Sequence, residues 1–230
     1  LDAVARNVAS LVRDGDTLQF GLGRLQACVL AALSEHRDLR LHAGMVSDGL
    51  VQLHASGALA APCAERPPVC TGVALGGPAL HALVADGSLV RFAGVEYTHS
   101  QATLAAIPNL VAVNSALEID LFGQVNCETL GGRQISGVGG LVDFIRGARA
   151  SAGGRAVIAA TSVAGRGRRS RIVPELNHRL TGIARTDIDH VVTEYGVASL
   201  RGLGVDARAR ALIAIAAPEH RAALEAAWHT

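Results

Sequence analysis

A glycine-rich segment ahead of a predicted helix is the part of this sequence best suited to stabilise a developing negative charge. Gly137, Gly139 and Gly140 lie close together around Val138. Because glycines leave the backbone uncovered, N–H groups here can approach a ligand and act as an oxyanion hole for a carbonyl under attack. A glycine hinge that only connects two elements would have the same composition, so the spacing alone leaves both interpretations open.

A second glycine turn lies between a predicted strand and a predicted helix, at Gly21, Leu22, Gly23, Arg24 and Leu25. Backbone N–H groups and the positive end of the helix can meet a phosphate or an oxyanion at such a turn. A tight turn that needs glycine for a positive φ explains the same residues. The segment lacks the third glycine of the G-x-G-x-x-G pattern, so a nucleotide-binding oxidoreductase is poorly supported.

Several titratable residues follow or flank predicted strands. His42 and Asp48 flank a predicted strand end, where open α/β sheets bind ligands. His42 is a candidate catalytic base or a packed histidine, and Asp48 is expected to be the N-cap of the next helix. Arg201 can pair with a phosphate, with Glu194 or with Asp206.

The composition narrows the class of partner. The formal net charge is +1 and charged residues make up 18% of the chain, which argues against disorder and against a nucleic-acid surface. The basic run at 166–171 is expected to be a solvated hairpin tip. We therefore expect small molecules and other protein chains as partners, and no nucleic acid.

Cysteine usage and hydropathy bear on metals and on the compartment. Cys28, Cys63, Cys70 and Cys127 have neither the spacing of a metal site nor that of a disulfide framework. No apolar stretch reaches the roughly 20 residues that span a bilayer, and no leader opens the chain. These features favour a cytoplasmic protein without metal or membrane contact. Helical periodicity begins at Leu1, which suggests a chain cut from something longer.

Strand-like and helix-like segments alternate along the first third of the chain. Strands are expected at 17–20, 39–42 and 69–75, and helices at 26–33, 48–53 and 78–84. Alternating units of this kind predict an α/β fold with an open, mostly parallel sheet and helices on both faces.

The middle of the chain has a different pattern. Residues 110–120 are too continuously β-branched and apolar for an amphipathic helix, and Gly123 with Gln124 favours a hairpin turn. We expect an antiparallel hairpin insertion there. The remaining elements are expected to be a helix through Arg149, strands at 156–160 and 188–193, and helices at 206–215 and 218–228.

Taken together, these segments resemble the acetyl-CoA hydrolase/4-hydroxybutyrate CoA-transferase family within the class I CoA-transferases. The resemblance covers nearly the whole chain and rests on the joint order of its motifs. The segments that carry it are 21–23, 42–49, 114–124, 136–144, 170–174 and 186–202.

Members of that family have two related α/β domains, and residues 1–230 resemble the second one. The resemblance implies a partner N-terminal domain absent from this chain, and homo-oligomers. It also implies that Gly21 to Leu25 and the neighbourhood of Asn114 contact coenzyme A, while Gly137 to Gly140 hold the thioester oxygen. Acyl-CoA and a small carboxylic acid would be the substrates, with no covalently bound cofactor.

The family's nucleophile is a glutamate that forms an acyl anhydride and then a glutamyl-CoA thioester, and both intermediates stay activated. Gly44 stands at the position that corresponds to this glutamate. Because glycine has no side chain to carry an acyl group, the covalent cycle cannot run through this position. Leu203 also stands where many relatives have lysine, which removes one possible cationic contact to phosphate.

Three explanations stay open for the vacant position. A water in the space of the missing side chain could attack the thioester with help from His42 or Glu96, which would make the protein a hydrolase. Another carboxylate, such as Glu118, could be the nucleophile of a transferase. Alternatively, the chain could be a catalytically inactive CoA-binding or regulatory subunit.

Overall fold

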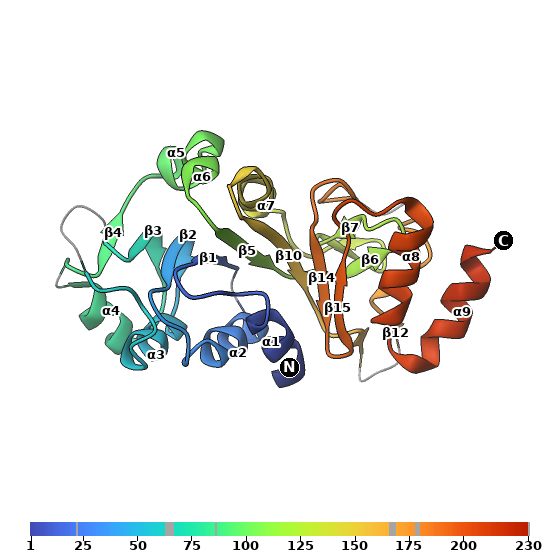
Figure 1. The fold of residues 1–230 in the computed structure, drawn as a ribbon, viewed down its shortest axis with the longest axis horizontal. Coiled ribbons are helices and arrows are strands. Elements are labelled where there is room, and N and C mark those ends of the chain that lie inside the picture. The colour runs from blue at the N-terminus through green and yellow to red at the C-terminus, as the bar shows by residue number, and fades with distance from the viewer. Residues whose placement is uncertain (22, 63–66, 86, 166–168, 178–179, 230) are drawn as a thin grey trace.

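The computed structural model describes residues 1–21, 23–62, 67–85, 87–165, 169–177 and 180–229. Within these residues, the main sheet has the order β15-β14-β10-β5-β1-β2-β3-β4 (Figure 1). Its strands run parallel except at one edge, where β14 and β15 form an antiparallel pair. The strands of this sheet are β1 (Thr17–Phe20), β2 (Arg40–Val46), β3 (Val69–Ala74), β4 (Val90–Phe92), β5 (Leu110–Asn114), β10 (Arg155–Ala159), β14 (His190–Thr193) and β15 (Gly196–Ser199).

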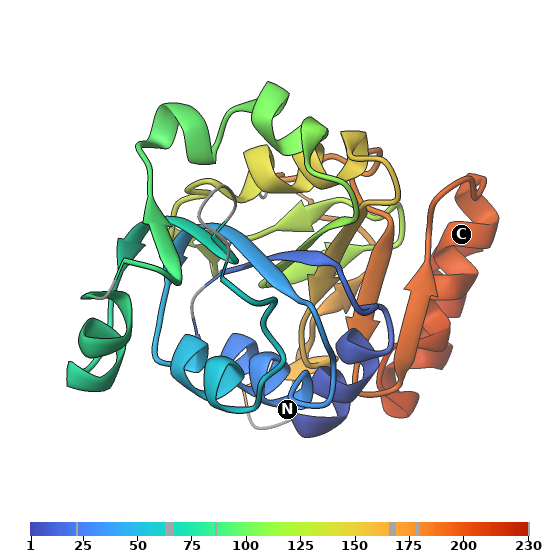
Figure 2. The ribbon, with the colours of Figure 1, turned by 60° about the vertical axis from the view of Figure 1, so that its left-hand side comes forward.

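Helices cover both faces of the sheet (Figures 1 and 2). Helices α1 to α4 lie on one face, α5 to α7 lie on the other, and α8 packs on β15 with α9 beside it. The predicted α/β class with a mostly parallel sheet is confirmed. The helices are α1 (Asp2–Ala9), α2 (Arg24–Ala32), α3 (Gly49–Ala55), α4 (Pro78–Ala85), α5 (Val95–Thr98), α6 (Gln101–Ala106), α7 (Leu141–Ala150), α8 (Val205–Ala214) and α9 (Pro218–Trp228).

The central strands are buried along their whole length because both of their faces are covered. Every residue of β1 and of β5 is buried. One core cluster, which includes Leu18 and Leu50, lies under α1 to α4. A second, which includes Leu104, Phe144 and Ile158, lies under α6 and α7 and continues toward α8. The sheet is thus held from both sides, and its strand ends are fixed relative to one another.

The predicted hairpin insertion is present, but the stretch 110–120 is not one strand. β5 ends at Asn114, and the chain resumes at Glu118 in a separate sheet ordered β13-β6-β7. β5 is held between β1 and β10, whereas β6 pairs antiparallel with β7 around Gly123, whose φ is 89°. The short strands outside the main sheet are β6 (Glu118–Asp120), β7 (Val125–Asn126), β8 (Thr129–Leu130), β9 (Arg133–Gln134), β11 (Val163–Ala164), β12 (Arg169–Ser170) and β13 (Ile172–Val173).

The second strand is longer than its sequence predicts. β2 continues past His42 to Val46, because its pairing with β3 extends to the pair Val46 and Ala74. The prediction that His42 flanks a strand end is therefore wrong, since His42 lies in the middle of the strand. Gly44 is also part of the strand, near its carboxyl end.

Candidate functional site

A cavity of about 620 Å³ opens at the carboxyl ends of β1, β2 and β5. Ligands of open α/β sheets bind at this end of the strands, and the volume lies in the range of small-molecule sites. The cavity is lined by Gln19, Phe20, Gly21, Gln26, Gly44, Met45, His99, Asn114, Ser115, Ala116, Leu117, Cys127, Ser136, Gly137, Val138, Gly139, Gly140, Leu141 and Phe144. Among these described residues there is no Asp or Glu.

Two side-chain amides form the polar floor of the cavity. Asn114 donates from Nδ2 to Oε1 of Gln19 at 2.8 Å, and Nε2 of Gln19 lies 3.4 Å from Oδ1 of Asn114. Both residues are buried, so the pair joins the ends of β5 and β1 at fixed positions. At the rim, Nε2 of Gln26 donates to Oγ of Ser115 at 2.7 Å. These amides and hydroxyls offer a ligand both donors and acceptors without any formal charge.

The glycine loop forms one wall. Among the described residues, the N–H groups of Gly137, Val138, Gly139 and Gly140 have no acceptor, and all four residues line the cavity. A Cβ added to Gly137 or to Gly139 would meet nothing within 4 Å. The loop leads into α7, whose first residue, Leu141, donates its N–H to the carbonyl oxygen of Val138 at 3.1 Å. The loop therefore offers backbone donors to a ligand in the cavity.

The imidazole of His99 occupies the space that a side chain on Gly44 would enter. A Cβ built on Gly44 would lie 2.8 Å from Cε1 and 3.0 Å from Nε2 of His99. A Cβ on Gly140 would also collide with the ring, and the ring of Phe144 packs against it with centroids 4.7 Å apart. Two glycines thus make the slot in which this half-buried ring lies.

Sequence reasoning did not identify His99. The residue lies 55 positions after Gly44, directly after the four-residue helix α5, which the sequence pattern does not predict. No spacing rule links the two positions. Only the packing of α5 over β2 and β3 brings them together.

His42 opens to a different cavity, although it shares a strand face with Gly44. Its Nε2 lies 3.0 Å from the carbonyl oxygen of Thr98, and its ring lies 5.9 Å from that of Tyr97. Burial lowers the pKa of His42; the hydrogen bond with Thr98 opposes this shift, and the electrostatic effects of His99 and Arg91 add to it. With Arg91 and Tyr97 it lines a smaller cavity of about 280 Å³, so it does not face Gly44's cavity.

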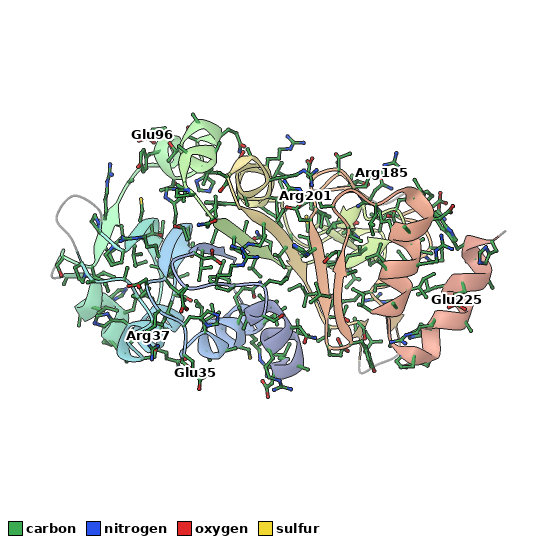
Figure 3. The ribbon with its side chains drawn as sticks, viewed as in Figure 1. Glu35, Arg37, Glu96, Arg185, Arg201 and Glu225 are labelled. Atoms are coloured by element: carbon green, nitrogen blue, oxygen red, sulfur yellow. The ribbon has the colours of Figure 1, made fainter. Side chains whose placement is uncertain are left out.

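The two glutamates considered from sequence also lie outside the larger cavity. The carboxylate of Glu118 is buried, and its Oε2 accepts a hydrogen bond from Nδ2 of Asn126 at 2.9 Å. Glu96 is exposed on α5 and points outward (Figure 3). Neither carboxylate shares the cavity with Gly44.

In the glycine turn at 21–25, Gly21 alone among the described residues lines the cavity. Leu22 lies outside the described residues. Gly23 is the N-cap of α2 with a φ of 127°, a backbone conformation that favours glycine. Arg24 is exposed, and Leu25 is buried in the core cluster under α2.

Asp48 precedes α3 as predicted, but its side chain does not cap that helix. Its Oδ1 accepts a hydrogen bond from the N–H of Gly77 at 2.8 Å, which joins the end of β2 to the turn before α4. Asp48 therefore lies at the predicted N-cap position, but its side chain does not make the capping hydrogen bond to α3.

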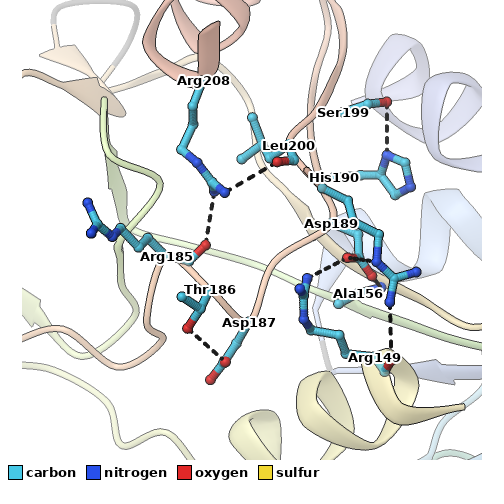
Figure 4. A network of polar contacts seen from close by, with 11 residues as sticks. Arg149, Ala156, Arg185, Thr186, Asp187, Asp189, His190, Ser199, Leu200 and Arg208 are labelled. Atoms are coloured by element: carbon cyan, nitrogen blue, oxygen red, sulfur yellow. Dashed lines mark hydrogen bonds and ion pairs between the residues drawn. The ribbon is translucent and has the colours of Figure 1, made fainter. Parts of the chain in front are cut away.

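Arg201 pairs with a carboxylate that sequence analysis did not consider. Its Nε lies 3.2 Å from Oδ1 of Asp189, which also accepts a hydrogen bond from Nη1 of Arg149 at 2.7 Å (Figure 4). Glu194 instead accepts hydrogen bonds from the N–H and Oγ of Ser162. Arg201 thus belongs to a network at the β14 end of the sheet, which explains its position without a phosphate.

Two further observations concern the described residues as a whole. They contain no group of three or more His, Cys, Asp or Glu side chains placed to hold a metal ion. They also contain no helix with the length and apolar character needed to cross a membrane.

Comparison with known proteins matches residues 76–228 to the family described as "Acetyl-CoA hydrolase/transferase C-terminal domain". A 4-hydroxybutyrate coenzyme A transferase of Clostridium kluyveri is 42% identical over 228 residues, which cover 96% of this chain and 52% of that protein. An acetyl-CoA hydrolase of Candida albicans is 37% identical over 105 residues, covering 45% of this chain and 20% of the relative. The crystal structure of RipA from Yersinia pestis superposes with a TM-score of 0.90 at 35% identity, covering 98% of this chain and 51% of that one. The chain therefore spans about half the length of the first relative and of RipA.

Proposed function

Because the chain belongs to the acetyl-CoA hydrolase/transferase C-terminal domain family, we propose that it binds an acyl-CoA in the 620 Å³ cavity and that water cleaves the thioester there. The thioester carbonyl lies against the N–H groups of Gly137 to Gly140, which stabilise the negative charge that forms on its oxygen. The amide floor of Gln19 and Asn114 fits the amide-containing arm of coenzyme A, which needs both donors and acceptors.

One observation carries the choice of hydrolysis over transfer. A transferase of the family type needs a carboxylate next to the thioester, and the cavity has none among its described lining residues. Glu118 is held by Asn126 outside the cavity, and Gly44 has no side chain. Water is then the nucleophile that the cavity can admit.

The alternative of an inactive binding subunit has no support from the named relatives, which are a transferase and a hydrolase. The identity of the acyl group and the need for a partner N-terminal domain or a homo-oligomer stay predictions from the family resemblance. A short-chain acyl group is the natural first choice, as in the names of these relatives.

The test uses the longest natural polypeptide that carries these residues. It is incubated with acetyl-CoA, butyryl-CoA or 4-hydroxybutyryl-CoA, with and without acetate, while free coenzyme A and new thioesters are measured. Hydrolysis predicts that free thiol is released at a rate independent of acetate. Acetate-dependent formation of acetyl-CoA from another acyl-CoA would show that a carboxylate nucleophile is present and would overturn the proposal.

A further inference from the structure

We propose that His99 is the general base that activates the hydrolytic water, acting from the space left empty by Gly44. This inference rests on the proposed function, because it names the residue that performs its chemical step. The family resemblance supplies no such role, since it places a carboxylate at the neighbouring strand position instead.

The position of the ring is the first argument. His99 lines the same cavity as the N–H groups of Gly137 to Gly140, so a base and an oxyanion site face one space. The ring fits between Gly44 and Gly140, where a Cβ on either residue would displace it, and Phe144 supports its side. A ring fixed in this way holds its nitrogen in one direction, as a catalytic base requires.

The contacts of Thr98 are compatible with the tautomer of His99 that the proposal requires. Oγ1 of Thr98 lies 3.3 Å from the carbonyl oxygen of Gly94, to which its one hydrogen can be donated. The same Oγ1 lies 2.9 Å from Nδ1 of His99 and is then the acceptor of an Nδ1–H hydrogen bond. In this tautomer Nε2 keeps its lone pair, and Nε2 is the nitrogen that lies next to Gly44 and Gly140. Within the described part of the chain, Nε2 has no hydrogen-bond partner.

Other candidate bases fit less well. His42 is buried in a different cavity, and its Nε2 is bound to the carbonyl oxygen of Thr98. Cys127 does line the larger cavity, but burial and the nearby charge of Glu128 raise the pKa of its thiol. A neutral thiol is a poor base and a poor nucleophile. Among the described lining residues, His99 is thus the group suited to accept a proton from water.

The chemical step balances without any further reactant. The oxygen of water attacks the thioester carbon while its proton moves to Nε2 of His99, and the carbonyl oxygen becomes an oxyanion held by the glycine loop. The tetrahedral intermediate then breaks its C–S bond. The imidazolium returns the proton to the departing sulfur, so the products are a carboxylic acid and coenzyme A thiol.

His99→Gln tests the inference, because glutamine keeps a polar side chain but cannot accept the proton. We expect kcat for acyl-CoA hydrolysis to fall by about 10²-fold or more, with affinity for coenzyme A unchanged by calorimetry. His54→Gln is the matched control, since His54 is exposed on α3 and lies outside the cavity. In His99→Ala, added imidazole should restore part of the lost rate, which a purely structural role would not explain.

The outcomes separate this inference from the proposed function. If the unaltered protein releases thiol without acetate and His99→Gln does so at the same rate, hydrolysis stands and the role of His99 is overturned. An acyl group trapped on His99 and found by mass spectrometry would also overturn it, because the residue would then be a nucleophile. If the unaltered protein binds coenzyme A but hydrolyses none of the three thioesters, both proposals fall.

Discussion

Cε1 of His99 lies 2.8 Å from the point where a Cβ on Gly44 would stand, so the histidine ring and any side chain at position 44 exclude each other. The strand position that the family resemblance predicts to correspond to a glutamate therefore lies against the ring of the residue that follows α5. This relationship makes glycine at 44 a structural requirement of the site. The following changes test that relationship and the fold around it.

Gly140→Ala should disturb the site without closing it. The added Cβ collides with the ring of His99, while the N–H of residue 140 remains. We expect kcat for thioester hydrolysis to fall by about 10²-fold, because a base displaced by about 1 Å loses that much. Gly204→Ala is the control outside the cavity, since its Cβ would meet nothing within 4 Å. Equal rates for the two variants would contradict the account.

Gly137 is a better probe of the glycine loop at 137–140 than Gly139. The φ of Gly139 is 53°, in the left-handed region, so Gly139→Val strains the backbone whether or not a ligand binds there. Gly137→Val places its side chain in open space at the cavity wall. We expect it to weaken coenzyme A binding in a folded protein, and calorimetry that shows unchanged affinity would remove the loop from the binding site.

Placing a carboxylate at position 44 should change the reaction type, provided that His99 is removed to make room. In Gly44→Glu combined with His99→Ala, the new carboxylate can enter the slot and attack the thioester. We expect acetate-dependent exchange of coenzyme A between acids. Chromatography of the thioesters measures this exchange. Gly44→Glu alone should perform neither reaction well, because the two side chains compete for one space. Exchange in His99→Ala alone would show that position 44 is not the source of the nucleophile.

Thr98→Val removes the hydroxyl that orients His99 and keeps the side-chain shape. Without Oγ1, Nδ1 loses its acceptor at 2.9 Å, so the two neutral tautomers of the ring should become more equally populated. The measurement is the ¹⁵N chemical shifts of the His99 ring, together with kcat, which should fall while KM stays the same. Unchanged ring shifts would show that Thr98 does not set the tautomer.

The sequence is sufficient to predict the parts of this site that depend on local patterns. The buried runs at β1 and β5 and the glycines at 137, 139 and 140 are recognisable because strand periodicity and uncovered backbone are local properties. The start of α9 at Pro218 follows from the missing N–H of proline in a first helical turn.

The unpredicted parts depend on contacts between distant segments. β2 runs through Gly44, a poor strand former, because its pairing with β3 outweighs local propensity. α5 and α6 are too short to show a helical stripe, and the packing of α5 over β2 and β3 brings His99 to Gly44. The break between Asn114 and Glu118 likewise depends on which strands compete for each segment.

Acid should destabilise the protein through His42. Burial lowers its pKa below the ordinary value of 6.5, so between these two values the unfolded chain takes up a proton that the folded chain refuses. Stability is then present above about pH 6.5 and falls as the pH decreases toward the folded-state pKa. The hydrogen bond with the carbonyl oxygen of Thr98 raises the pKa of His42 and opposes this shift, whereas His99 and Arg91 lower the pKa in the same direction as burial.

His42→Gln should therefore lose less stability on acidification than the unaltered protein. Urea unfolding at about pH 7.5 and about pH 5.5 measures how much free energy of unfolding each protein loses on acidification. His190, whose pKa is also lowered by burial, remains in both proteins and cancels in the comparison. Identical acid sensitivity would show that His42 is not protonated on unfolding in this range.

Asp189 should contribute more to stability than its neighbour Asp187. The buried carboxylate of Asp189 joins Arg149 and Arg201 and accepts the N–H of Ala156 at 3.0 Å, which holds α7, β10 and β14 together (Figure 4). Asp189→Ala leaves that buried N–H without an acceptor, so we expect a loss of about 3 kcal/mol in the free energy of unfolding. Asp187→Ala breaks an ion pair with Arg146, whose side chain is 58% exposed, and should cost less than about 1 kcal/mol.

Denaturant unfolding of the two alanine variants and of Asp189→Asn measures this difference. Asparagine keeps an oxygen for the N–H of Ala156 but loses the charge that pairs with Arg149 and Arg201. The free energy of unfolding of Asp189→Asn should therefore lie between those of the unaltered protein and of Asp189→Ala. If Asp189→Asn costs as much as Asp189→Ala, the charge carries the whole effect and the backbone bond adds nothing. If Asp187→Ala costs as much as Asp189→Ala, burial of the carboxylate is not what makes the network stabilising.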